Sequence, residues 1–130
     1  MIALLLALHC PDSFHLRWTA AQVSAFPPER FAAIAQVESG CSLNARLRGH
    51  HCLAKRDCEV GRFQIKPSTA RKRCPGYNIW TYDGNVRCAL TILGDNRVLL
   101  GLTDATRRFN GAGPASFEYL YKVLKREEAP

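Results

Sequence analysis

Several features that would assign this chain to a common class of protein are scarce or missing from its 130 residues. No stretch approaches the run of about 18 to 20 apolar residues that a membrane-spanning helix needs, so we expect a soluble domain. No long alternating run or hairpin pair predicts strands, and there is no internal repeat or low-complexity segment. Acidic residues are also few, 11 against 18 Lys and Arg. We therefore expect a mainly α, basic domain.

The net charge of +7 favours an anionic partner, such as nucleic acid, anionic lipid or an acidic wall polymer. The basic residues are spread along the chain, however, and the densest cluster is the short run 71–73. No DNA- or RNA-binding motif accompanies them, so we expect no nucleic-acid partner. The length suits one domain with a single core, and we expect a monomer.

Six cysteines, an even number in a short chain, indicate disulfide bonds and an oxidising compartment. The pairing does not follow from the sequence. Our interpretation pairs them as Cys10–Cys41, Cys52–Cys58 and Cys74–Cys88. A competing metal site would use five neighbouring side chains, His50, His51, Cys52, Asp57 and Cys58. Adjacent histidines and an isolated C-x5-C do not match common zinc spacings, so we expect neither a metal nor a cofactor.

Residues 1–10, MIALLLALHC, are similar to the apolar core of an export signal. They lack the basic residues that usually precede such a core and a small-x-small cleavage site after it. A clipped or weak export signal and a first buried helix both fit this segment, and the sequence leaves both interpretations open. The main domain is then expected to span residues 11–130.

The most informative stretch covers residues 27–40, PPERFAAIAQVESG. Pro28 suits the first position of a helix, and Gly40 suits the left-handed conformation that often ends one. At about 100° per residue, the apolar stripe of this helix also takes in one acid. Its members are Phe31, Ile34, Ala35 and Glu38. The sequence therefore predicts a helix of about three turns with a carboxyl group on its buried face.

An apolar wall disfavours the carboxylate anion, and the negative end of a helix acts in the same direction. Both raise the pKa of a glutamic acid from its reference of about 4.3. A glutamic acid that stays protonated near neutral pH can serve as a general acid. The simpler interpretation is that Glu38 leans into solvent or pairs with one of the arginines.

Apolar residues at helical spacing predict five further helices. They cover residues 13–25, a segment opening at Pro67 and breaking at Pro75, residues 86–97, residues 104–109, and a segment opening at Pro114. The expected buried stripes of the first and last comprise Phe14, Trp18, Ala21 and Ala25, and Phe117, Leu120, Tyr121 and Leu124. Residues 83–85 are interpreted as a turn and Thr103 as a helix cap. Residues 44–58 are interpreted as a surface excursion, with a small irregular or β element near residues 50–65.

Five sequence blocks follow one another in a characteristic order. They are VESG at 37–40, EVGRFQIKPSTA at 59–70, DGNVRCALTIL at 83–93, RRFNGAG at 107–113 and EYLYKVL at 118–124. Together they resemble the motif series of the soluble-lytic-transglycosylase-like family, relatives of goose-type lysozymes, over nearly all of residues 27–124. The resemblance implies a lysozyme-like domain over residues 11–130, with a groove for the glycan strands of peptidoglycan.

In that family, the glutamate of the E-S block is the single catalytic acid/base, and it corresponds to Glu38. It would protonate the glycosidic oxygen between N-acetylmuramic acid and N-acetylglucosamine. It would then take a proton from the muramic C6 hydroxyl as a 1,6-anhydro ring closes. This lytic transglycosylase reaction needs no protein nucleophile, unlike the paired-carboxylate scheme of most glycosidases.

The resemblance also implies substrate-binding residues: Ser39, Gly61, Phe63, Gln64, Ile65, Phe109, Asn110 and Tyr119. Glycine allows close approach of the backbone, and the amides of Gln64 and Asn110 suit N-acetyl groups. Each position also has an ordinary structural interpretation, such as core packing or helix capping. Relatives usually carry tyrosine where this chain has Phe109, so reduced or lost activity is conceivable. Tyr119 lies off the apolar stripe of its helix and is expected to face the groove near Glu38.

Two alternatives to the lyase stay open. A lysozyme-type hydrolase of the same fold would need a second carboxylate to position water, and the candidates are Asp57, Glu59 and Asp83. A non-catalytic wall-binding or assembly component would need none. The resemblance implies peptidoglycan strands as the partner and a periplasmic or exported location. Small domains of this kind accompany secretion, conjugation or phage machinery, but nothing in the sequence selects one.

Overall fold

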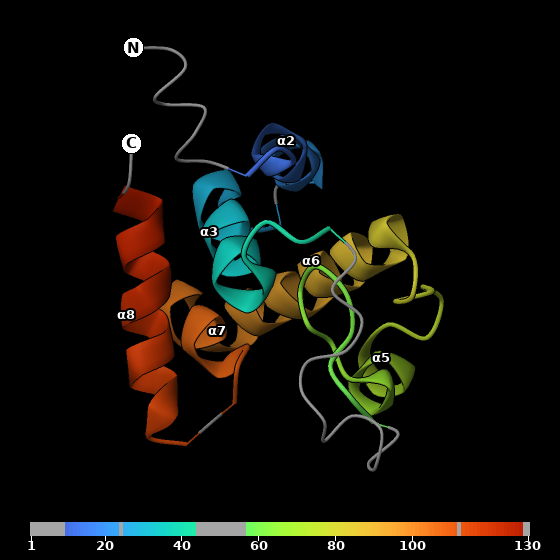
Figure 1. The fold of residues 1–130 in the computed structure, drawn as a ribbon. Helices are drawn as coiled ribbons and strands as arrows, with labels where there is room; N and C mark the ends of the chain where they lie inside the picture. Colours follow the sequence, from blue (N-terminus) through green and yellow to red (C-terminus); the bar gives the residue numbers. More distant parts are fainter. Residues whose placement is uncertain (1–9, 24, 44–56, 112, 129–130) are drawn as a thin grey trace.

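The computed structural model describes residues 10–23, 25–43, 57–111 and 113–128 (Figure 1). These residues form the helices α2 (Ser13–Val23), α3 (Pro28–Ser39), α5 (Pro67–Arg73), α6 (Tyr82–Leu100), α7 (Leu102–Arg108) and α8 (Ala115–Glu128). An antiparallel bridge joins Val60 and Ile65. The expected mainly α class, with a small β element inside residues 50–65, is confirmed. Residues 1–9 lie outside the described residues, and so does the larger part of the expected excursion over 44–58.

Helix α3 lies at the centre of the arrangement. Helices α2 and α8 both pack against α3, α7 packs against α6 and α8, and α5 rests on α6. In Figure 1, α6 passes behind α3 and α7, while α8 stands beside α3. Phe31 and Ile34 of α3, Leu93 of α6 and Val123 of α8 are fully buried in the shared hydrophobic core, together with Phe63. The shared core therefore joins α3 to α6, to α8 and to the segment that contains Phe63.

The sequence predicted α3 correctly in its limits and in its face. Pro28 occupies the first helical turn, and Gly40, with φ of 63°, follows the last helical residue. The four residues of the predicted stripe, Phe31, Ile34, Ala35 and Glu38, are all buried. Helix α5 also begins at Pro67 and ends before Pro75, as expected.

The predicted buried faces of α2 and α8 are wrong. In α2, Phe14 and Trp18 are exposed, and the buried residues are Ser13, Leu16 and Ala20. In α8, Phe117 and Tyr121 are exposed by 64% and 60%. The buried residues of α8 are Ser116, Tyr119 and Val123. Helix α2 packs on α3, and α8 packs on both α3 and α7, where the Ser116 hydroxyl accepts a hydrogen bond from Arg107 at 2.8 Å.

The rings of α8 that point outward lie against cations instead. The Arg107 guanidinium lies 4.5 Å from the centre of the Phe117 ring, and the Lys125 ammonium lies 5.5 Å from that of Tyr121. Cation–π contacts of this kind stabilise a half-exposed ring without burying it. Size and apolarity alone therefore gave the wrong face of this helix.

Two predicted helix starts are also corrected. Helix α6 begins at Tyr82, and the Thr81 hydroxyl caps it by accepting a hydrogen bond from the Gly84 backbone N–H at 3.1 Å. Residues 83–85 thus form the first turn of the helix rather than a turn before it. Helix α7 begins at Leu102 after Gly101, so Thr103 lies inside the helix and is not its cap. Helix α6 thus begins four residues, and α7 two residues, before the expected starts at 86 and 104.

Two of the three predicted disulfides are confirmed, Cys10–Cys41 and Cys74–Cys88. The third, Cys52–Cys58, cannot be placed because Cys52 lies outside the described residues, as do His50 and His51 of the competing metal site. Within the described ranges there is no cluster of three or more His, Cys, Asp and Glu side chains that could hold a metal ion. The same ranges contain no helix long and apolar enough to cross a membrane.

Candidate active site

Two adjoining cavities form a groove beside the C-terminal end of α3. The first, which we call the acidic pocket, has a volume of about 280 Å³ and includes Glu38, Glu59, Glu118 and Tyr119 in its lining. The second, which we call the basic arm, has a volume of about 290 Å³ and lies along α5 and α6. Glu59 and Asn110 line both cavities. The two cavities are therefore adjacent, with these two side chains at their boundary, and we refer to them together as the groove.

Glu38 lies in the acidic pocket at the last turn of α3 and is only 7% exposed. The phenol of Tyr119, on α8, donates a hydrogen bond of 2.8 Å to Oε2 of Glu38. Burial raises the pKa of Tyr119 well above its ordinary value of 10, and the charge of Glu38 and the hydrogen bond to it act in the same direction. Tyr119 therefore stays protonated and holds the carboxyl in one orientation.

A tight turn over residues 60–65 places Gln64 and Ile65 in the basic arm. Gly61 and Gln64 both adopt positive φ, 79° and 52°. The side chain of Asn85, on α6, holds this turn: its amide donates to the Val60 carbonyl at 2.8 Å, and its oxygen accepts the Phe63 N–H at 2.8 Å. A Cβ at position 61 would collide with Asn85, so only glycine fits there.

The groove brings together most of the residues that the sequence analysis selected. Its lining includes Glu38, Gln64, Ile65, Phe109, Asn110 and Tyr119. Ser39, Gly61 and Phe63 line neither cavity and are buried behind it. Phe63 stacks on Phe31 at 4.6 Å and meets the edge of Phe109 at 6.3 Å, measured between ring centres. These three residues therefore lie outside the lining of the groove and pack behind it.

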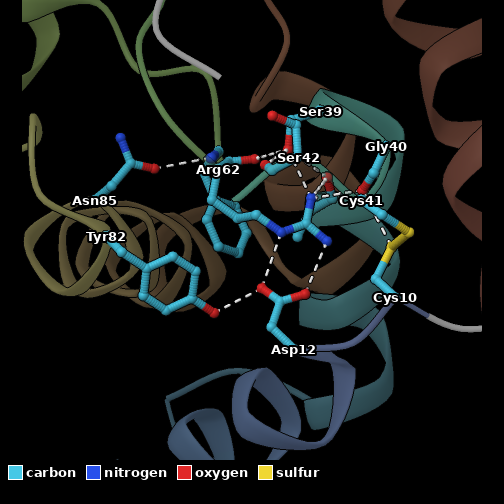
Figure 2. A network of polar contacts seen from close by, with 11 residues as sticks. Cys10, Asp12, Ser39, Gly40, Cys41, Ser42, Arg62, Tyr82 and Asn85 are labelled. Carbon is cyan, nitrogen blue, oxygen red and sulfur yellow. Dashed lines mark hydrogen bonds and ion pairs between the residues drawn. A yellow bond between two sulfur atoms is a disulfide. The ribbon is translucent and has the colours of Figure 1, made fainter. Parts of the chain in front are cut away.

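Sequence analysis missed a buried ion pair behind the groove. Arg62 is 1% exposed, and its guanidinium donates to both carboxylate oxygens of Asp12, at 2.9 and 3.2 Å. Figure 2 shows the guanidinium between Asp12 and the end of α3. The Tyr82 phenol donates to Asp12 at 2.6 Å, and burial, together with this hydrogen bond, raises the pKa of Tyr82 above its ordinary value. The Asp12–Arg62 pair is thus fully enclosed and hydrogen-bonded.

The same guanidinium binds the last turn of α3. It donates to the carbonyls of Ala35 and Gly40, each at 2.7 Å, and to the Ser39 hydroxyl at 2.6 Å. The Ser39 hydroxyl in turn donates to the Arg62 carbonyl at 2.7 Å. A cation here meets the carbonyl groups that a helix leaves unsatisfied at its C-terminus. Ser39 therefore has a structural partner, and its neighbour Glu38 is left facing the groove.

One signal in the sequence could have suggested this pair. Arg62 lies between Gly61 and Phe63 in a segment expected to pack near the core, and a buried arginine needs an anionic partner. Nothing in the sequence identifies Asp12, 50 residues earlier, as that partner. The disulfide Cys10–Cys41 anchors the segment before Asp12 to the residue after Gly40. It thus keeps both ends of the network together.

The three candidate second carboxylates are in different places. The Asp57 carboxylate accepts hydrogen bonds from the backbone N–H and the hydroxyl of Ser68, at 2.8 and 2.6 Å, and these bonds lower the pKa of Asp57. Asp83 is exposed and pairs with Arg87 at 3.0 Å. Glu59 alone of the three lines the groove. Of these three carboxylates, Glu59 is therefore the one placed to act together with Glu38.

No model of a known protein family matches the sequence, and no curated protein or solved structure matches the chain. What the site can do must therefore be argued from its geometry. It combines a buried carboxyl group, a phenol donor that fixes this carboxyl, and amide side chains along a groove of two cavities. Such a site suits general acid/base chemistry on an extended polar ligand.

Proposed function

We propose that the protein is a peptidoglycan lytic transglycosylase with Glu38 as its single acid/base. The observation that carries this proposal is the buried Glu38 carboxyl, which lines a groove and accepts a hydrogen bond from Tyr119. The order of the five sequence blocks supports the same reaction by resemblance. The groove offers Asn110 and Gln64 for N-acetyl groups. The two disulfides support an oxidising location, which for this substrate is the periplasm or the outer face of the cell envelope.

The proposed reaction begins with a protonated Glu38. Its proton passes to the glycosidic oxygen, the bond from that oxygen to C1 of N-acetylmuramic acid breaks, and the C6 hydroxyl oxygen of the same sugar bonds to C1. The proton of that hydroxyl returns to Glu38, so the enzyme is restored and no water is consumed. Tyr119 keeps its donor on Oε2 throughout and prevents the carboxyl from rotating away. Phe109 provides an apolar wall in the basic arm and no hydrogen bond of its own.

A hydrolase of lysozyme type is the second candidate, and one observation favours it. Glu59, which directly precedes the turn over residues 60–65, lines the acidic pocket together with Glu38. A second carboxylate in this place would activate a water molecule for attack at C1. The products then separate the two reactions, because hydrolysis yields a reducing-end sugar and the lyase yields a 1,6-anhydro end.

The test is digestion of purified peptidoglycan sacculi, followed by mass spectrometry of the soluble fragments. We expect 1,6-anhydromuramic ends from the wild type. Glu38→Gln should reduce their release by about 10² to 10⁴-fold, the usual contribution of general acid/base catalysis, because an amide cannot donate the proton. Glu29→Gln, in the exposed first turn of the same helix, is the matched control and should retain full activity.

Reducing ends in place of anhydro ends would replace the lyase with the hydrolase, and Glu59→Gln would then be expected to abolish release as well. Full activity of Glu38→Gln would defeat both enzymatic proposals. Binding of sacculi without any release of fragments by the wild type would leave the non-catalytic wall-binding protein as the function.

A further inference from the structure

The two cavities of the groove carry opposite charge. The acidic pocket has three carboxylates in its lining, Glu38, Glu59 and Glu118, and one ammonium, Lys122, which lies 3.7 Å from Glu118. The lining of the basic arm has three cations, Lys66, Arg73 and Arg108, and one carboxylate, Glu59, which it shares with the acidic pocket. The charge along the groove thus reverses across Glu59 and Asn110.

The three cations of the basic arm come from the two ends of α5 and from the end of α7. Lys66 precedes α5, Arg73 is the last residue of α5, and Arg108 is the last residue of α7. All three are exposed, and within the described ranges none of them forms an ion pair. The Arg73 guanidinium donates to the side-chain oxygen of Asn96, on α6, at 2.8 Å. This hydrogen bond directs the guanidinium toward α6. Three cations converging on one cavity are a site for an anion, and guanidinium groups match the planar geometry of a carboxylate.

We infer that the basic arm binds carboxylate groups carried by the glycan strand, beside the sugar that reacts at Glu38. This inference rests on the proposed function for the identity of the strand. Neutral chitin-like strands carry no carboxylate for Lys66, Arg73 and Arg108 to bind.

The carboxylates have two sources on a peptidoglycan strand, the lactyl ether of muramic acid and the peptide stem attached to it. Both present the same group to Lys66, Arg73 and Arg108. Strands with intact stems and strands from which an amidase has removed the stems distinguish the two sources. Neutral chitooligosaccharides of matched length provide the ligand without carboxylates.

The experiment measures binding of these three ligands to Glu38→Gln protein, which leaves the strands intact. The test variant adds Lys66→Gln, Arg73→Gln and Arg108→Gln. The control variant adds Lys72→Gln, Arg71→Gln and Arg97→Gln, which remove two arginines and one lysine that line neither cavity of the groove. Arg71 and Arg73 lie on the same helix and carry the same charge, but only Arg73 lines the basic arm. Comparing the two variants therefore tests where the cations lie, because both variants lose the same number of charges. Urea denaturation of both variants checks that the fold is retained.

We expect the Glu38→Gln parent to bind carboxylate-bearing strands more tightly than chitooligosaccharides, with a difference that shrinks as salt is added. The test variant should lose about threefold in affinity for each cation, and about thirtyfold for the three together, since exposed ion pairs contribute a fraction of the 1.4 kcal/mol that is tenfold in affinity. Its affinity for chitooligosaccharides should not change. The control variant should lose less than about twofold for any ligand.

Equal losses in the two variants, an unchanged test variant, or no binding of any ligand would overturn the inference. Cleavage of sacculi by the wild type is measured separately. If the protein prefers carboxylate-bearing strands through Lys66, Arg73 and Arg108 but releases no fragments, the proposed reaction is wrong and the inference about the basic arm holds. If it cleaves sacculi but binds neutral and carboxylate-bearing strands equally, only the inference about the basic arm is wrong.

Discussion

The last turn of α3 faces two different environments. On the groove side, Glu38 lines a cavity and accepts a hydrogen bond from Tyr119. On the rear side, the Arg62 guanidinium bonds to Asp12, to Ser39 and to two carbonyl groups of the turn, out of contact with solvent. The rear side holds the turn in place with buried charge, and the groove side remains accessible to a ligand. A reacting group is held accurately when the residues behind it are themselves fixed.

The largest loss of stability should come from removing the Arg62 guanidinium, which holds the rear side of the turn. Arg62→Met keeps the volume but leaves the Asp12 carboxylate buried without its cation, which we expect to cost about 3–5 kcal/mol of unfolding free energy. Urea denaturation measures this loss. Arg87→Met is the control, because Arg87 and Asp83 form an exposed pair at 3.0 Å and its removal should cost less than about 1 kcal/mol.

The double variant Arg62→Met/Asp12→Leu sharpens this test. If the loss in Arg62→Met arises from an unpaired buried charge, removing that charge as well should restore part of the stability. If Arg62→Met alone is as stable as the Arg87→Met control, the hydrogen bonds of Arg62 do not hold the turn.

The two disulfides provide the next comparison. Cys10–Cys41 closes a separation of 31 residues beside the rear network, and Cys74–Cys88 closes 14 residues next to α5. On the chain-entropy account, replacing both cysteines by alanine should cost about 4 kcal/mol for the first pair and about 3 kcal/mol for the second. Urea denaturation under oxidising conditions measures both.

Only loss of Cys10–Cys41 should also loosen the end of α3, because this bridge ties the segment before Asp12 to the residue after Gly40. Amide hydrogen exchange at Ser39 and Gly40 should therefore become faster in the Cys10→Ala/Cys41→Ala variant and stay unchanged in the Cys74→Ala/Cys88→Ala variant. The same rate increase in both would mean that the rear side does not depend on this bridge in particular.

On the groove side a smaller change is expected from Tyr119→Phe. It removes the donor to Glu38 and keeps the buried ring, so release of fragments from sacculi should fall about tenfold, which corresponds to a lost hydrogen bond to a charged group of about 1.5 kcal/mol. Tyr121→Phe, two residues later and exposed, is the matched control and should change nothing. Stability close to wild type in both variants would assign the effect to the groove. Unchanged activity in Tyr119→Phe would contradict a role for the phenol.

The smallest effect concerns Asp57, which lies on neither side of the turn. The hydrogen bonds from Ser68 lower the pKa of Asp57 in the folded protein, so the deprotonated form favours folding. Its contribution is present above the unfolded pKa of about 3.9 and is lost as the pH falls through the lower folded value. Thermal melting from pH 2 to pH 6 should therefore show Asp57→Asn slightly below the wild type near pH 6 and converging with it in acid. A constant difference at every pH would assign the effect to shape and not to charge.

Local patterns were informative wherever a helix had one clear apolar stripe and strong end signals. Helix α3 had both, and its limits, its face and the burial of Glu38 agree with the sequence analysis. Helix α8 carries aromatic residues on two faces, and in both α2 and α8 the stripe of large rings at i, i+4 proved to be exposed. Their buried faces include Ala20 and Ser116, and the Ser116 hydroxyl accepts a hydrogen bond from Arg107 of α7 at 2.8 Å. Counting large apolar residues does not detect such a face.

The candidate site was predictable in its members and not in their roles. Glu38, Gln64, Asn110 and Tyr119 line the groove, whereas Ser39, Gly61 and Phe63 support it from behind. The positive φ of Gln64 and the pairing of Arg62 with Asp12 have no signal in the sequence that could identify them. They depend on which segments meet after the helices have packed.

By itself, the sequence determined a mainly helical chain and one helix with a buried acid in its last turn, because these depend on residue types and spacings within a few turns. Only the tertiary structure decided that Arg62 finds Asp12 across 50 residues and that the Tyr119 phenol donates to Oε2 of Glu38. It also decided that the cations meet along one arm of the groove. The physical reason is that a helix fixes its own periodicity locally, while the partner of each face is chosen by how well whole helices pack together.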